Sequence, residues 1–84
     1  MADIQEYKCP CCGCFTFGSE PQGNYDICPV CYWEDDPLQL IDEDFEGGAN
    51  KVSLKQAREN YKQFGACEEG MTGHVRKPTD EEKG

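Results

Sequence analysis

The chain has few basic residues, one histidine and no long apolar run, and each shortage argues against a class of function. Its 84 residues include 8 Lys and Arg against 17 Asp and Glu, a formal net charge of -9. Such a surface repels phosphate backbones, so nucleic acid is not expected as a partner. His74 is the single histidine, and no metalloprotease, deaminase, serine-hydrolase or phosphate-loop motif is present. We therefore expect no enzyme activity.

Apolar content is low as well. Only 37% of residues are hydrophobic, and the mean hydropathy is -0.80. No stretch approaches the roughly 20 apolar residues that span a bilayer. Residues 1–6 lack the basic and then apolar start of a secretory signal, so we expect a cytoplasmic protein with no membrane association. The length predicts one domain, residues 1–84, with a core over about 7–76 and a flexible tail over 77–84. So small a core is expected to need additional stabilisation, such as a bound metal ion.

Cysteine is what the chain has in abundance. Four of its seven cysteines form two C-x2-C pairs, Cys9 with Cys12 and Cys28 with Cys31, separated by 15 residues. The odd total excludes complete disulfide pairing within one chain, and in a reducing cytosol such pairs are typical of metal ligands. The pattern predicts a tetrahedral four-cysteine site that holds one structural Zn²⁺.

A second pair, Cys11 with Cys14, overlaps the first cluster and has the same spacing. Gly13 decides between them. The residue after the second cysteine of such a turn often takes a positive φ, which glycine adopts without steric cost. Gly13 stands in that place for Cys9 and Cys12, which are therefore the predicted ligands.

The second turn has Tyr32 where the first has Gly13. A positive φ is costly for an aromatic residue. We therefore expect the second turn to be distorted or shaped differently from the first.

Three cysteines remain outside this assignment. Cys11, Cys14 and Cys67 could join His74 in a second site with three cysteines and one histidine. Cys11 or Cys14 could instead have a redox role near the metal, where a cation lowers the pKa of a thiol. The simplest interpretation leaves all three as thiols that are partly buried or exposed without a function.

Short strands are expected on both sides of each cysteine turn. Residues 7–8 and 15–17 flank the first turn, and residues 25–27 and 32–33 flank the second. Alternating aromatic and polar residues support this assignment. The result is a small antiparallel sheet of zinc-ribbon or rubredoxin-like type, with each strand pair ending at half of the metal site.

One helix is predicted over residues 54–64, which makes the fold class α+β. Ser53 and Gln56 form a capping-box pattern at its start, and Gly65 suits the left-handed residue after its end. Its apolar residues recur at three- and four-residue steps and would cover the sheet: Leu54, Ala57, Tyr61 and Phe64.

The segment over residues 34–46 has seven acidic residues and no basic one, which predicts a loop with an apolar anchor. At its start, Trp33 together with Glu34, Asp35 and Asp36 is a candidate surface for a protein partner. The alternative is a core tryptophan followed by a solvated turn.

Several stretches of the chain resemble the bacterial cysteine-rich CPCC domain family. They are CPCCG at 9–13, ICPVCYWEDD at 27–36, GGAN at 47–50, FGAC at 64–67 and VRKP at 75–78. The resemblance extends over roughly residues 7–80 and implies a compact, bacterial, cytoplasmic, zinc-ribbon-like domain. The family more usually carries an aromatic residue in place of Cys14, which argues against a metal role for this cysteine.

The sequence thus predicts a small non-enzymatic zinc-binding module that acts through an unidentified protein partner. The alternative is a rubredoxin-like iron protein for electron transfer, since paired cysteine turns suit both metals. A third hypothesis is a nucleic-acid-binding zinc ribbon. Four cations on and before the helix would serve it, Lys51, Lys55, Arg58 and Lys62, but the acidic background makes a solvated face the simpler interpretation.

Overall fold

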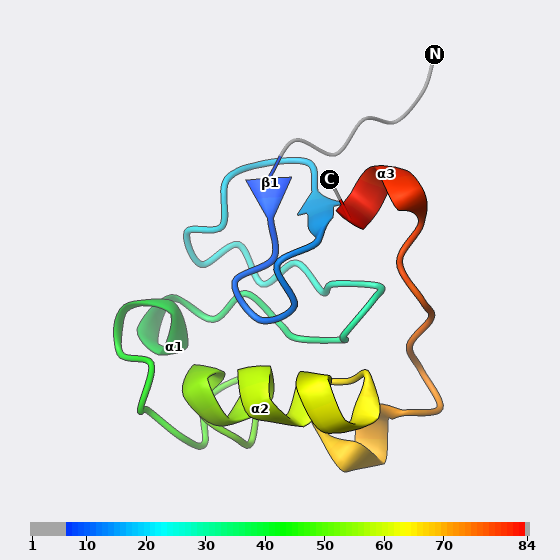
Figure 1. The fold of residues 1–84 in the computed structure, drawn as a ribbon. Coiled ribbons are helices and arrows are strands. Elements are labelled where there is room, and N and C mark those ends of the chain that lie inside the picture. The colour runs from blue at the N-terminus through cyan, green and yellow to red at the C-terminus, as the bar shows by residue number, and fades with distance from the viewer. Residues whose placement is uncertain (1–6, 84) are drawn as a thin grey trace.

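The fold places a strand pair and two cysteine turns above one long helix (Figure 1). The computed structural model describes residues 7–83, so the prediction of a signal-free start, which concerns residues 1–6, lies outside the described residues. The elements in chain order are β1 (Tyr7–Lys8), β2 (Phe15–Phe17), α1 (Pro37–Ile41), α2 (Leu54–Phe64), the 3-10 turn η1 (Glu69–Met71) and α3 (Asp80–Lys83).

Over residues 7–83, no helix has the length and apolar character that crossing a membrane requires.

The two named strands flank the first cysteine turn. β1 and β2 pair antiparallel, with Tyr7 opposite Phe17. The second predicted strand pair is reduced to one isolated bridge between Ile27 and Glu34. Tyr25 and Tyr32 explain this correction, because their φ angles of 60° and 70° interrupt an extended backbone on both sides of the second turn.

The helix predicted over residues 54–64 coincides with α2. The Ser53 hydroxyl accepts a hydrogen bond from the Gln56 backbone N–H at 3.0 Å. Gly65 ends the helix with a φ of 76°. The Gln56 side chain donates to Asn60 instead of turning back to Ser53, so only half of the capping box forms. Leu54 begins the buried stripe of the helix.

The expectation of a single helix was wrong, since the acidic segment 34–46 contains α1. The Asp36 carboxylate caps this helix and accepts hydrogen bonds from the backbone N–H groups of Leu38 and Gln39. Pro37 follows at the first helical position, where a missing N–H costs nothing. Asp-Pro at the start of an apolar segment is therefore a helix start within what we predicted to be a loop.

The predicted tail also contains structure. Thr79 and Glu82 cap α3 reciprocally: the Thr79 N–H donates to the Glu82 carboxylate, and the Glu82 N–H donates to the Thr79 hydroxyl. Arg76 pairs with the same carboxylate at 2.7 Å. α3 lies against β2, far from it in sequence (Figure 1). The Thr-x-x-Glu pattern at residues 79–82 is the sequence signal for the start of α3.

The core is small and rich in sulfur. Trp33 and Leu54 are its largest hydrophobic side chains with no exposed surface. Around them lie other buried hydrophobic residues, Val30, Ala57 and Phe17, and six of the seven cysteines. A core of this composition places thiol groups where a larger domain would have aliphatic side chains.

Candidate metal centre

The two cysteine turns have the same backbone hydrogen bonds. In the first, the Gly13 N–H donates to the Cys9 carbonyl at 2.8 Å, and the Cys9 N–H donates to the Cys14 carbonyl. In the second, the Tyr32 N–H donates to the Cys28 carbonyl at 2.7 Å, and the Cys28 N–H donates to the Trp33 carbonyl. The first and second cysteines of each pair therefore face the same side of their turn.

The expected distortion of the second turn is absent. Tyr32 adopts a φ of 70°, close to the 76° of Gly13. Its ring stacks on that of His74, with ring centroids 5.2 Å apart, and packs against the core. These contacts offset the backbone strain that an aromatic residue has at a positive φ.

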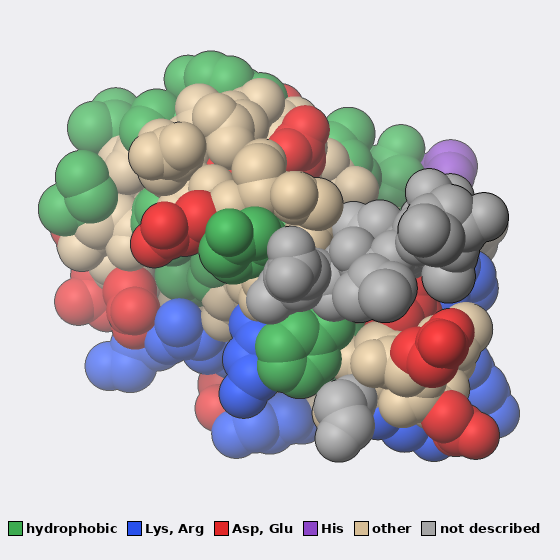
Figure 2. All heavy atoms as spheres, turned by 90° about the horizontal axis from the view of Figure 1, so that it is seen from above, with side chains coloured by type: hydrophobic (Ala, Val, Ile, Leu, Met, Phe, Trp, Pro, Cys, Tyr) green, Lys and Arg blue, Asp and Glu red, His purple; other side chains and the backbone are tan. Residues whose placement is uncertain are grey.

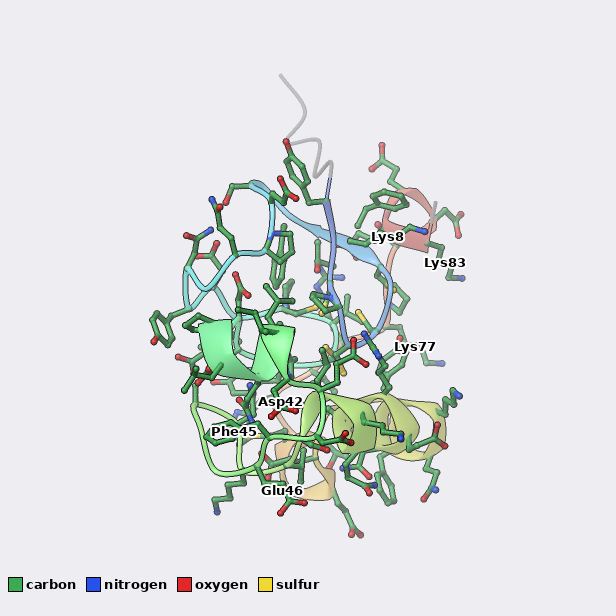
Figure 3. All side chains as sticks on the ribbon, turned by 90° about the vertical axis from the view of Figure 1, so that its left-hand side faces the viewer. Lys8, Asp42, Phe45, Glu46, Lys77 and Lys83 are labelled. Atoms are coloured by element: carbon green, nitrogen blue, oxygen red, sulfur yellow. The ribbon has the colours of Figure 1, made fainter. Side chains whose placement is uncertain are left out.

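The turns bring four thiols together at the centre of the molecule, where Figure 3 shows the sulfur atoms in yellow. The sulfur atoms of Cys9, Cys12, Cys28 and Cys31 all lie within 4.8 Å of one another. Cys9 and Cys31 are 3.6 Å apart at sulfur, and Cys12 and Cys28 are 3.7 Å apart. We call these four residues the thiol cluster. Its closest sulfur pairs each join one turn to the other.

This geometry fits a metal tetrathiolate. Zinc–sulfur bonds of about 2.3 Å in a tetrahedron place the sulfurs about 3.8 Å apart. The closest pairs of the thiol cluster, at 3.6 and 3.7 Å, approach that value. Four soft donors suit Zn²⁺ or iron. The residues present therefore fit a tetrahedral metal ion.

Two hydrogen bonds support the cluster sulfurs. The Cys11 backbone N–H donates to the Cys9 sulfur at 3.4 Å. The Thr16 hydroxyl lies 3.1 Å from the Cys28 sulfur and can donate to its thiolate. Thr16 is buried, although its place between Phe15 and Phe17 in an alternating strand indicates a polar face. Sequence reasoning missed Thr16, because nothing local shows that this face of β2 meets the thiols.

The electrostatics of the cluster favour a cation. The Cys12 thiol interacts with the Cys28 sulfur, which lowers the pKa of Cys28 far below its ordinary value and raises the pKa of Cys12. The pKa of Cys31 is raised as well, first by the neighbouring Cys11 thiol. One thiolate is thus stabilised by protonated neighbours. Removing the remaining protons places like charges side by side, which only a bound cation can balance.

The other predicted metal ligands do not come together. In the part of the chain that the structure describes, the thiol cluster is the single group of at least three potential cysteine, histidine or carboxylate ligands. Cys14 is directed to the Cys12 carbonyl, 4.0 Å from its sulfur. Burial, followed by the charge of Cys11, raises the pKa of Cys67 to about 12, so this thiol stays protonated. His74 stacks on Tyr32 at the surface.

The residues predicted to form a partner surface are mostly buried. Trp33 and Asp35 are 0% and 1% exposed, Asp36 is also buried, and Glu34 is half-buried. The Asp35 carboxylate accepts three backbone N–H groups from residues 22–24, each at 3.1 Å. The alternative of a core tryptophan is the one observed, but the acidic residues after it are structural rather than solvated.

Gln39 and Asn50 complete a buried polar network that the sequence analysis missed. The Gln39 amide donates to the carbonyls of Phe45, Asn50 and Val52 at 2.9–3.2 Å. Its oxygen accepts from the Asn50 backbone and side chain. Asn50 also exchanges two hydrogen bonds with the Glu34 backbone. We call Asp35, Asp36, Gln39 and Asn50 the polar hub. It holds the acidic segment in place beside the second cysteine turn.

Arg58 is a further residue whose role the sequence did not reveal. Its Nε donates to the Pro10 carbonyl at 2.8 Å, and its guanidinium pairs with Glu43 at 2.7 Å. Arg58 therefore joins α2 to the first cysteine turn and to the acidic segment. Its charge predicts a solvated face, whereas the side chain is half-buried and bonded at both ends.

A family model described as Cysteine-rich CPCC matches residues 7–82, which include both cysteine turns and all the helices except the last residue of α3. No curated protein matches the chain. The chain belongs to the cysteine-rich CPCC family.

Proposed function

We propose that this member of the cysteine-rich CPCC family is a non-enzymatic module in which the thiol cluster binds one structural Zn²⁺. The observation that carries the proposal is the spacing of the closest sulfur pairs, 3.6 and 3.7 Å across the two turns. Four thiolates fill a tetrahedral shell, which leaves no position for a metal-activated water. The role that follows for the site is to hold the two turns together.

The size of the core supports a folding role for the metal. Few large apolar side chains are buried, and the thiol cluster occupies the place between the turns. When a small domain gains its metal only on folding, the free energy of metal binding stabilises the fold. All seven cysteines are free, and a reducing, cytoplasmic compartment would keep the four ligands available.

Metal content tests this proposal directly. The protein should be purified without added metal or chelator and weighed by native mass spectrometry. We expect one zinc per chain, lost in the variant Cys28→Ser and retained in Cys14→Ser, whose thiol is buried outside the cluster. A protein that binds no metal, or a Cys14→Ser variant that loses it, would contradict the assignment.

Iron is the alternative metal, and one observation favours it. Cys12 is only partly buried, unlike the other three ligands, and an exposed ligand edge is where an electron-transfer partner could approach. Ferric tetrathiolate is red, whereas the zinc form is colourless. A red native protein whose colour bleaches on reduction would replace the zinc proposal with electron transfer.

We further propose that the module acts through a protein partner that contacts α1. Leu38 and Ile41 on this helix are 60% and 84% exposed. Exposed carboxylates follow them at Asp42 and Asp44, and Figure 3 shows Asp42 and Glu46 to the left of and below Lys77 and Lys83. Charge complementarity favours a partner segment with apolar side chains flanked by lysine or arginine.

Site-specific photo-crosslinking tests this surface. A photo-reactive residue placed at position 41 should form an adduct in cells, while the same residue at the exposed Gln63 should not. The captured protein is then purified and titrated with the wild type, Ile41→Ser and Gln63→Ser. We expect about tenfold or greater loss of affinity for Ile41→Ser alone. Equal affinities for all three proteins would overturn the surface assignment.

A further inference from the structure

The four residues of the thiol cluster differ in their access to solvent. Cys9, Cys28 and Cys31 are 0–1% exposed. Cys12 is only partly buried. A molecule that takes metal from the thiol cluster, or delivers metal to it, must first reach one of the four cysteines from solvent. Cys12 is the cysteine that such a molecule can reach first.

A groove leads to Cys12. It has a volume of about 510 Å³ and lies between the first cysteine turn and α2. Arg58 lines this groove and joins its sides, because its Nε donates to the Pro10 carbonyl at 2.8 Å and its guanidinium donates to the Glu43 carboxylate. The residues lining the groove are Cys11, Cys12, Glu43, Lys55, Arg58, Glu59, Tyr61 and Lys62.

The charged side chains that line the groove are more basic than the chain as a whole. Apart from its cysteines, the lining has three cations and two carboxylates, whereas the whole chain has a net charge of -9. Arg58 pairs with Glu43 and Lys62 with Glu59, which leaves Lys55 as the excess cation of the lining.

Basic residues continue beyond the groove. Tyr61 also lines a neighbouring pocket of about 230 Å³ that contains Arg76 and Lys77. Lysine and arginine side chains gather along one edge of the face in Figure 2, and Figure 3 shows Lys8, Lys77 and Lys83 on the same side of the molecule. A small anion therefore approaches more easily here than over the acidic segment.

We propose that the groove over Cys12 is a binding site for a small anionic metal-chelating molecule, and that metal enters and leaves the thiol cluster there. The inference rests on the proposed metal site. With metal bound, Cys12 would be the ligand that a carboxylate or thiolate of the incoming molecule displaces first, because it lines the groove. The displaced thiolate would take a proton from water, and Cys9, Cys28 and Cys31 would keep the metal in place meanwhile.

Chelator kinetics test the proposal on the metal-loaded protein. Metal release is followed by the loss of thiolate-to-metal absorbance, with EDTA as an anionic probe and TPEN as an uncharged one. The test variant is Lys55→Gln, in the groove lining. The control is Lys51→Gln, which makes the same change in net charge at an exposed position outside the groove.

We expect the test variant to slow release to EDTA about threefold or more at low salt, with release to TPEN unchanged. The control should match the wild type with both chelators, and salt at about 0.5 M should remove the difference. Equal rates for the test and control variants, or equal slowing with both chelators, would overturn the proposal.

Thiol modification gives a second, independent measurement. During slow alkylation of the metal-loaded protein with iodoacetamide, peptide mass mapping should find Cys12 modified before the other three ligands. Earlier modification of Cys9 or Cys28 would overturn the assigned route. If native mass spectrometry finds no bound metal, the metal site and the groove proposal both fail. If metal is bound but the rates do not differ, the groove proposal fails alone.

Discussion

The thiol cluster and the polar hub are two buried polar centres that stabilise the fold by different means. Both join segments distant in sequence: the thiol cluster joins the two cysteine turns, and the hub joins residues 22–24, 34–39 and 45–52. The hub has most of its donors and acceptors paired within the chain, and one oxygen of the Asp35 carboxylate is buried without a hydrogen-bond partner. The thiol cluster consists of four like groups that need an external cation before all can ionise.

Given the proposed metal site, this difference predicts that only part of the fold depends on metal. Asp36 illustrates the hub's independence: its carboxylate accepts from the backbone of Leu38, Gln39 and Ala49. A Cβ on Gly48 would lie 2.6 Å from the Asp36 carboxylate, so the loop approaches as closely as glycine allows. Because most hydrogen-bonding groups of this network are paired within the chain, the hub specifies one conformation without a ligand.

The largest effect is expected from Cys28→Ser. It removes a ligand together with the Thr16 hydrogen bond to its sulfur, and with them a metal-linked free energy on the order of 10 kcal/mol. Thermal unfolding should show loss of the cooperative transition, while Cys14→Ser should unfold close to the wild type. Similar melting curves for the two variants would contradict the assignment of Cys28, but not Cys14, as a metal ligand.

Acidification should separate the two centres. Protons compete with metal for the thiolates, so metal affinity falls as the pH falls. Desolvation alone would raise the pKa of Asp36, but the N–H groups of Ala49, Gln39 and Leu38 hold this pKa below its ordinary value. The contribution of Asp36 to the free energy of unfolding is therefore complete at a pH above the ordinary pKa of an aspartate. It is lost only as the pH falls through the lower pKa that Asp36 has in the folded state.

We thus expect metal release, followed by a zinc-sensitive dye, at a higher pH than the loss of hydrogen-exchange protection at the Gln39 and Asn50 amides. A single common midpoint for release and for loss of protection would mean that the hub depends on the metal.

Gln39→Ala should break the hub and leave the thiol cluster intact. It strands the carbonyls of Phe45, Asn50 and Val52 in a buried site. We expect a loss of about 3 kcal/mol in the free energy of unfolding, measured with denaturant on the metal-loaded protein. Metal stoichiometry should stay at one. Gln63→Ala, at an exposed position on α2, is the matched control. An equal loss in this control would contradict a stabilising role for the hub.

Gly13→Ala tests the two halves of the thiol cluster against each other. A Cβ at Gly13 would meet no atom within 4 Å, so its cost arises from the φ of 76° alone, about 1–2 kcal/mol. Tyr32→Gly relieves the same strain in the second turn but removes the stack on His74. We expect this second change to be near neutral in denaturant unfolding. A large stabilisation by Tyr32→Gly would show that the stack does not offset the strain.

The smallest effect is expected outside both centres, at α3. Arg76 holds the pKa of Glu82 at about 2, and Glu82 caps the helix through Thr79. Glu82→Gln removes the ion pair and should lower the free energy of unfolding by about 0.5–1 kcal/mol at neutral pH. Amide exchange should increase in residues 79–83 and remain unchanged in α2. Faster exchange throughout the chain would give α3 a larger role than we assign.

The features that the sequence revealed are those in which the chain signals its own local geometry. Cys9 and Cys12 were selected over the overlapping pair by Gly13, and the turn has the φ that this choice requires. The bounds of α2 followed from Ser53 and Gly65 in the same way. By contrast, α1 lies in a segment whose acidic residues predict a loop, and α3 lies in the predicted flexible tail, although Asp36 and Thr79 cap these two helices.

The sequence by itself determined the two cysteine turns, the long helix and the candidate ligand set, because spacing and cap residues act within a few positions of one another. Only the tertiary structure decided that Trp33, Asp35 and Asp36 are buried, that Thr16 reaches a cluster sulfur, and that Cys12 opens onto a basic groove. Each of these depends on which distant segment covers a side chain. No local pattern encodes that, because burial and hydrogen bonding across the core are set by packing among segments remote in sequence.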